Sequence, residues 1–114
     1  MPLSETVKHQ VETQLQFFCD NRVPPQVRDK VNLTFDFQGN AVTLRENRPR
    51  WNDPSQWTHS AIAQFRFEPT TGQWTLYCAD RNSKWHEYLV VEPTSRFDVL
   101  LEEVNKDPTA IFFG

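Results

Sequence analysis

Glycine, cysteine and methionine are scarce in this sequence, with three, two and one among 114 residues. So few glycines leave no glycine-rich phosphate-binding loop, and no apolar run approaches the roughly 18 residues of a membrane span. The start of the chain lacks the basic and then apolar segments of a signal peptide, so we expect a cytoplasmic protein. Cys19 and Cys78 form no C-x-x-C motif, which in that compartment favours two reduced, buried thiols over a disulfide or redox pair.

Signatures of catalysis and of metal binding are also missing. The sequence contains no nucleophile elbow and no paired-base motif. His9, His59 and His86 lie far apart, and none has a second histidine or a cysteine at ligand spacing. A zinc site would have to be assembled from separate elements without support from the sequence. We therefore expect no metal and no other cofactor.

The sequence does have many aromatic residues and a balanced charge. It contains nine Phe, four Trp and two Tyr, and each such side chain can bury roughly 150–250 Å². A net charge of −3, with 24% charged residues, argues against a disordered acidic tail and against a basic nucleic-acid coat. The length indicates a single domain over residues 1–114 that can bury a core of its own.

The first third of the chain predicts a helix followed by a β-hairpin. Ser4 can cap a helix over about residues 4–20, whose apolar positions draw one stripe: Val7, Val11, Leu15 and Phe18. The pair Pro24-Pro25 ends it. A strand alternates from Val31, and Gly39-Asn40 fits a two-residue turn with glycine at positive φ. The returning strand then brings apolar residues opposite one another, Val42 with Phe37 and Leu44 with Phe35.

Residues 61–91 predict an antiparallel meander. Three alternating runs are joined by two four-residue turn signals, P-T-T-G and D-R-N-S. Pairing through the first turn is read directly from the spacing: Phe67 with Trp74, Phe65 with Leu76, and Ala63 with Cys78. Both plausible registers of the second turn place Trp85 and Leu89 on the same apolar side.

The last part of the chain predicts a second helix and a docked tail. Ser95 and Asp98 offer a capping box for a helix over about residues 96–106, with the apolar stripe Phe97, Leu100, Leu101 and Val104. Pro108 stops this helix, and we expect the apolar tail Ile111, Phe112 and Phe113 to dock on the core. The fold class is therefore α+β: a five-stranded antiparallel sheet over about residues 31–91, hairpin plus meander. Both helices are expected on the face of Phe35, Phe65, Trp74 and Trp85.

Residues 48–59 interrupt this pattern with two prolines and no periodicity, so we expect a long connection. It carries Arg48, Arg50, Trp51 and Trp57, and Arg45 lies just before it. One interpretation is that the tryptophans fill the core while each arginine stacks on a ring or pairs with a carboxylate. The other is a rim that binds an anion or stacks single-stranded nucleic acid.

Six ordered motifs give the sequence a family resemblance. They are E-N-R-P-R-W at 46–51, A-Q-F-R-F at 63–67, W-T-L-Y at 74–77, D-R-N at 80–82, W-H-E-Y at 85–88 and D-P-T-A-I-F-F-G at 107–114. Together they resemble a family of small bacterial proteins classed as a domain of unknown function. Cys78, Ser83 and Glu87 stand where that family commonly has tryptophan, glycine and a basic residue. The resemblance implies a compact bacterial α+β domain and brings no activity with it.

The face of the meander opposite the helices is the candidate recognition surface. Alternation assigns to it Gln64, Arg66, Thr75, Tyr77, Lys84, His86 and Tyr88. An ordinary solvated sheet face has this composition, but tyrosine and arginine also combine rigid area with planar hydrogen bonding. With Arg45, Arg48, Arg50, Trp51 and Trp57, these residues favour a non-enzymatic binding module for a protein or a small anionic ligand. Nucleic acid is a less favoured partner, and no membrane is expected.

An enzyme is the alternative from another class. Alternation puts Glu46 and Glu87 on the core side, where a carboxylate must pair, raise its pKa or reach water. Such a group could act with His86 and an arginine as an acid/base site, although adjacent strand residues point to opposite faces. We lean against this hypothesis, and we expect a monomer or a weak homodimer because the chain can complete its core alone.

Overall fold

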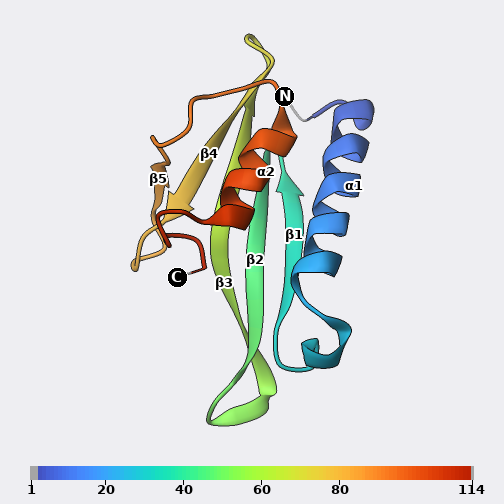
Figure 1. Cartoon of the computed structure of the whole chain (residues 1–114), viewed down its shortest axis with the longest axis vertical. Coiled ribbons are helices and arrows are strands. Elements are labelled where there is room, and N and C mark those ends of the chain that lie inside the picture. The colour runs from blue at the N-terminus through green and yellow to red at the C-terminus, as the bar shows by residue number, and fades with distance from the viewer. Residues whose placement is uncertain (1–2, 114) are drawn as a thin grey trace.

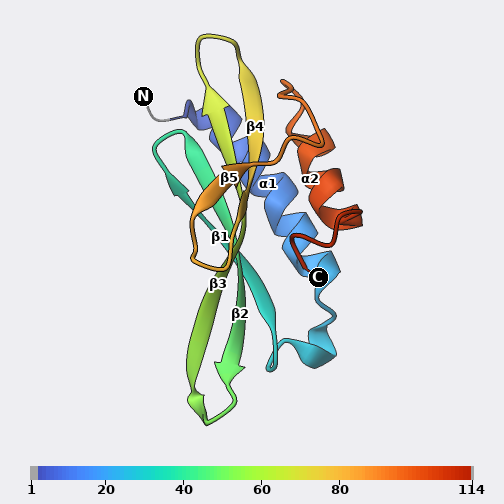
Figure 2. The same ribbon diagram turned by 90° about the vertical axis from the view of Figure 1, so that its left-hand side faces the viewer.

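The computed structural model describes residues 3–113, which form an α+β domain of 46 × 27 × 24 Å. Its elements are α1 (Glu5–Arg22), a 3₁₀ turn at Pro25–Val27, β1 (Asn32–Gln38), β2 (Ala41–Arg50), β3 (Asp53–Glu68), β4 (Gln73–Ala79), β5 (Trp85–Glu87) and α2 (Phe97–Lys106). The strands make one antiparallel sheet in the order β1-β2-β3-β4-β5. Both helices cover the same face of this sheet (Figures 1 and 2), so the predicted fold class is confirmed.

Helix α1 forms as its sequence predicts. The backbone N–H of Val7 donates to Ser4 Oγ at 3.3 Å, which caps the helix. The stripe buries Val11, Leu15, Phe18 and Cys19 against the sheet. Both cysteines are free and buried, and burial raises the pKa of Cys19 to about 12. The helix ends at Arg22, two residues later than expected.

The sheet registers of the first hairpin and of the meander's first turn are those predicted from alternation. Phe35 lies opposite Leu44, and Phe65 lies opposite Leu76. Gly39 adopts φ of 60° in the first turn, where a side chain would be strained. The core centres on an aromatic cluster in which the ring of Phe97 lies 4.7 Å from Phe65 and 5.1 Å from Trp74. Helix α2 therefore closes the core over the middle of the sheet.

Residues 48–59 are not a loop, which corrects the prediction. Strand β3 begins at Asp53, and β2 extends to Arg50, so these residues form the far end of a long β2–β3 hairpin. Two prolines do not break it because Pro49 lies at a position where no ladder N–H is needed, and Pro54 stands at the start of its strand. A register shift between Leu44 and Arg45 bends the hairpin at its base.

The second meander turn also differs from the prediction. Five residues, 80–84, separate the paired residues Ala79 and Trp85, one more than the D-R-N-S signal suggested. A shift of one residue moves every side chain of a strand to the other face. Trp85 therefore lies on the open face, and Leu89 is 81% exposed rather than buried.

The C-terminal segment docks on the core, as expected. Phe112 is 5% exposed, and its ring lies 4.9 Å from that of Tyr88. Asp107, in the left-handed conformation at the end of α2, accepts hydrogen bonds from the backbone N–H groups of Phe112 and Phe113. Ile111 is about half exposed. The predicted Ser95 cap is wrong, because the N-cap of α2 is Arg96 and its side chain makes no capping bond.

Candidate functional site

The far end of the β2–β3 hairpin, residues 48–60, projects from the body of the domain and is called the arm below. β1 begins opposite Asn47, and β4 reaches only as far as Ala63, so the arm has two strands where the body has five (Figure 1). Every residue from 51 to 60 is exposed. Trp51, in the turn at the tip, is 94% exposed, and Trp57 is 36% exposed. The interpretation in which both tryptophans fill the core is therefore wrong.

Charges along the arm are partly paired. Arg48 Nε donates to Glu46 Oε1 at 2.9 Å, and this hydrogen bond raises the pKa of Arg48. Glu46 does point to the helix side, as alternation predicted, but it lies at the margin of the sheet and has its arginine partner. Asp53 accepts hydrogen bonds from the backbone and hydroxyl of Ser55. Within residues 3–113 no ion pair involves Arg50, which leaves its guanidinium beside Trp51 at the tip.

A polar network on the open face fixes the base of the arm. Asn47 is only 4% exposed, and its amide donates to Asn32 Oδ1 at 2.7 Å and to Thr34 Oγ1 at 3.0 Å. His59 Nδ1 lies 2.6 Å from Asn47 Oδ1, so the amide has partners on both of its ends. A buried amide left unpaired would be costly, and these bonds hold β1, β2 and β3 together where the arm leaves the body. No signal in the sequence singled out Asn47.

On the upper part of the open face, Arg66 and Tyr77 lie together as predicted. The guanidinium of Arg66 stacks 3.8 Å from the centre of the Tyr77 ring, and its Nε donates to Gln64 Oε1 at 2.6 Å. The two residues help to line a hollow of about 330 Å³. Farther along the face, Arg45 pairs with Asp36 at 2.9 Å. Both arginines are thus engaged with neighbours in the sheet, which fits a stabilised sheet face at least as well as a ligand site.

His86 and Tyr88 lie on the helix side, contrary to prediction. This follows from the same one-residue shift in the second meander turn, which pairs His86 with Cys78. Tyr88 is buried, and its hydroxyl donates to Glu103 Oε2 at 2.8 Å, so burial raises its pKa. Glu87 moves to the open face and is exposed. The predicted set is therefore split: Arg66 and Tyr77 lie on the open face, the arm carries Arg48, Arg50, Trp51 and Trp57, and His86 and Tyr88 lie behind the sheet.

The carboxylate nearest to an imidazole belongs to a turn. His86 Nε2 lies 2.7 Å from Asp80 Oδ2, and Asp80 Oδ1 accepts hydrogen bonds from the backbone N–H groups of Asn82 and Lys84. The bond to His86 lowers the pKa of Asp80, with help from the backbone donors. The histidine side chain is 60% exposed. This geometry closes the β4–β5 turn, and it gives the enzyme hypothesis no enclosed reaction site.

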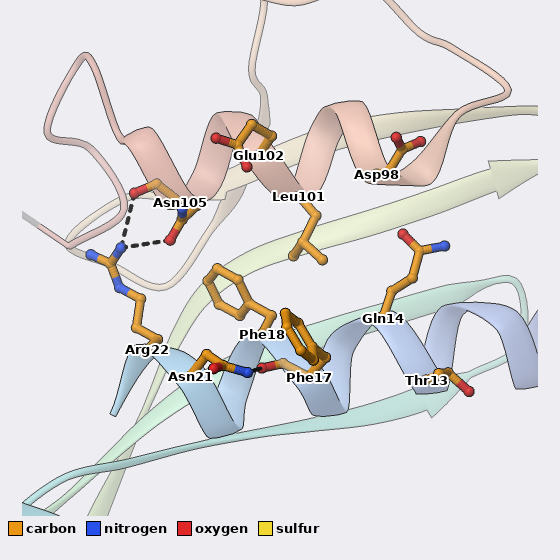
Figure 3. Close-up of a pocket in the computed structure, with 10 residues that line it drawn as sticks. All are labelled: Thr13, Gln14, Phe17, Phe18, Asn21, Arg22, Asp98, Leu101, Glu102 and Asn105. Carbon is orange, nitrogen blue, oxygen red and sulfur yellow. Dashed lines mark hydrogen bonds between the residues drawn. The ribbon is translucent and has the colours of Figure 1, made fainter. Parts of the chain in front are cut away.

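A groove between α1 and α2 was not expected from the sequence. It has a volume of about 580 Å³, and Phe17, which is 70% exposed, projects into it from α1 beside Leu101 of α2 (Figure 3). Arg22 closes one end by donating two hydrogen bonds to Asn105, at 2.9 and 3.0 Å. An exposed phenylalanine just before the buried Phe18 was the available signal. Because Asp98 and Glu102 also line the groove, it suits an apolar or cationic group better than an anion.

The sequence matches the family described as Domain of unknown function (DUF3024) over residues 3–114. The chain belongs to this family, which confirms the resemblance drawn from the motifs. No curated protein and no solved structure matches the chain significantly. Among the described residues, no helix is long and apolar enough to cross a membrane. In the same part of the chain, no group of three or more His, Cys, Asp or Glu residues is placed to hold a metal ion.

Proposed function

We propose that this chain is a non-enzymatic protein-binding module that presents the tip of the arm to its partner. The observation that carries the proposal is the exposure of the whole segment 51–60, with Trp51 94% exposed. Ordering a residue costs about 1–2 kcal/mol of backbone conformational entropy, and an exposed ribbon recovers little of it by burial. Contact with another molecule would recover more. The expected setting is the bacterial cytoplasm.

The chemistry of the tip supports a protein as the partner. Tryptophan and arginine are the residue types that most often dominate binding energy at protein interfaces, and here Arg50 adjoins Trp51. Glu46 and Asp53 offset the positive charge of Arg48 and Arg50, so the arm has no strong field of one sign. Shape and aromatic area would then decide affinity, while Arg50 would select a carboxylate on the partner.

The double substitution Arg50→Ala with Trp51→Ala tests this proposal. Neither side chain contributes to the core, so the melting temperature should stay unchanged while affinity for the partner falls by at least about tenfold. The matched control is Arg81→Ala with Leu89→Ala, which removes an arginine and a large apolar side chain from exposed positions elsewhere. Partners are identified by affinity capture with quantitative mass spectrometry, and dissociation constants are then measured with the purified partner. Equal affinity of the wild type and the tip variant would refute the proposal.

Single-stranded nucleic acid is the second candidate, favoured by the exposed ring of Trp51 next to Arg50. Bases stack on aromatic side chains at about 1–3 kcal/mol each, and binding would weaken as salt rises because neutralised phosphates release counterions. Titration of a labelled oligonucleotide at low salt distinguishes the two functions. A rise in anisotropy that is lost in the tip variant would favour nucleic acid over protein.

A further inference from the structure

One edge of the arm is a strand without a neighbour. β4 pairs with β3 only from Ala63 to Glu68, so the part of β3 before Ala63 is paired with β2 alone. Among residues 3–113 no other backbone hydrogen bond reaches this segment. The free edge is defined here as Ser55 to Ala61, and it lies beside the lower end of β4 and β5 (Figure 2).

Alternation of the backbone shows which groups face outward. The two-residue turn at Gly39-Asn40 makes Gln38 and Ala41 a hydrogen-bonded pair, so every second residue of β2 from Val42 onward turns its N–H and C=O toward β3. Two of these residues, Glu46 and Arg48, lie opposite Ser60 and Thr58. Ser60 and Thr58 therefore face β2 with their backbone groups.

The alternate residues of the free edge carry the unpaired groups. Trp57, His59 and Ala61 direct their N–H and C=O groups away from β2. The outer edge of β2 is different, because Pro49 occupies the corresponding position there and has no N–H to offer. The two edges of the arm are thus unequal: proline blunts one, and the other is free to pair.

The side chains of the free edge do nothing to prevent pairing. Natural edge strands are usually protected by lysine, proline or a charge that points inward. Residues 54–65 contain no Asp, Glu, Lys or Arg, although these make up 24% of the chain. The segment is rich in residues that favour strands and low in charge, which is the composition of segments that add to another strand.

We propose that the free edge pairs antiparallel with the same edge of a second copy of this chain, around a two-fold axis at Thr58. Thr58 is the midpoint of Ser55 to Ala61, so this register pairs the whole free edge. Trp57 then lies opposite His59 of the second copy, on the same face of the joined sheet. The two such pairs supply about four backbone hydrogen bonds, since both residues direct their groups outward.

The ends of the free edge match the same register. Pro54 of the second copy falls opposite Ile62, the residue skipped in the pairing of β2 with β3. Just beyond it, at Ala63, the place of a partner strand is already taken by β4. A second copy thus stops pairing where the neighbouring strand of the first begins. An extended segment of a different protein would not need this match, which favours a second copy as the occupant.

Cross-linking tests the register. In this arrangement the Thr58 residues of the two copies form a non-hydrogen-bonded pair, with Cα atoms about 4.5 Å apart, which is within the range of a disulfide. The variant Thr58→Cys should form a covalent dimer of twice 13.5 kDa under mild oxidation. Cys19 and Cys78 are buried and should not interfere. The control Thr71→Cys, at an exposed turn position, should remain a monomer on a non-reducing gel.

Charge swaps test the association itself by analytical ultracentrifugation over a concentration series. The wild type should reach a dimer, whereas Thr58→Lys and Thr58→Glu should each associate at least about tenfold more weakly, because like charges then face each other. Mixing the two variants should restore a dimer, and Thr71→Lys should behave as wild type. A wild type that stays monomeric, or cross-linking no better at position 58 than at 71, would overturn the proposal. Association that survives both single charges would assign the contact to another surface and equally refute it. These variants keep Arg50 and Trp51, so failure here leaves the proposed binding by the tip intact.

Discussion

Asp80 shows at the scale of a single residue how local hydrogen bonds set both a turn and a pKa. Its carboxylate accepts from two backbone N–H groups and lies 2.7 Å from His86, and it stands where the five-residue turn decides the facing of β5. The bond to His86, followed by the backbone donors, lowers the pKa of this carboxyl. A lowered folded-state pKa means that the stabilisation is present above the unfolded-state pKa and is lost as the pH falls through the folded-state value.

The substitution Asp80→Asn should therefore destabilise the protein at neutral pH and matter less in acid. We expect a lower melting temperature than wild type at pH 7, and a difference that shrinks as the pH falls below about 4, the ordinary pKa of aspartate. The measurement is thermal denaturation across that pH range. Asp29→Asn, at an exposed position before β1, is the control and should follow wild type. A difference that stays constant with pH would show that the turn does not depend on the charge of Asp80.

At the scale of elements, the helices and the arm have opposite energetic roles. Helix α2 buries Phe97, Leu100, Leu101 and Val104 over the sheet, and this burial accounts for its formation despite the absence of a side-chain cap. The arm buries almost nothing beyond its base, where Asn47 and His59 hold it. Its regularity follows from the β2–β3 ladder rather than from a core.

The pair Leu100→Ala and Leu89→Ala measures the contribution of α2 packing. Leu100 is fully buried, so its truncation leaves a cavity and should cost about 2–5 kcal/mol of unfolding free energy. Leu89 is 81% exposed, so the same substitution there should change stability by less than about 0.5 kcal/mol. Urea denaturation followed by tryptophan fluorescence gives both values. A cost at Leu89 similar to that at Leu100 would contradict the assignment of the two faces.

For the whole molecule, the C-terminal segment joins three distant parts of the chain. Phe112 packs on Tyr88 of the segment after β5, Asp107 fixes the backbone of the segment to the end of α2, and Arg22 of α1 stacks 3.9 Å from the ring of Phe113. These contacts are made within one chain (Figure 1). The segment therefore completes the core on the side that β5, with three residues, leaves thinly covered.

Phe112→Ala should lower the unfolding free energy by about 3 kcal/mol, independently of protein concentration. Ile111→Ala, at a half-exposed position of the same segment, is the matched control and should have little effect. Both are measured by urea denaturation at a low and a high protein concentration. A loss that disappears at the higher concentration would instead place Phe112 at an interface between copies.

The sequence by itself determined the parts of the molecule whose pattern is local. Helical spacing fixed α1 and α2, and strand alternation with a short turn fixed Phe35 opposite Leu44 and Phe65 opposite Leu76. It also carried the family resemblance. These predictions succeed because a period of 3.6 or of 2 leaves one way to bury the apolar residues.

Only the tertiary structure decided which candidate residues share a surface. One additional residue in the β4–β5 turn moved His86 and Tyr88 behind the sheet, because turn length is set by the hydrogen bonds of Asp80 and not by apolar pattern. The arm carries no apolar periodicity, so its strands could not be recognised until β2 and β3 were paired. The groove at Phe17 and the free edge at Thr58 likewise exist only through elements that lie beside them or stop short of them. Alternation acts within a strand, whereas a site depends on how far its neighbours extend.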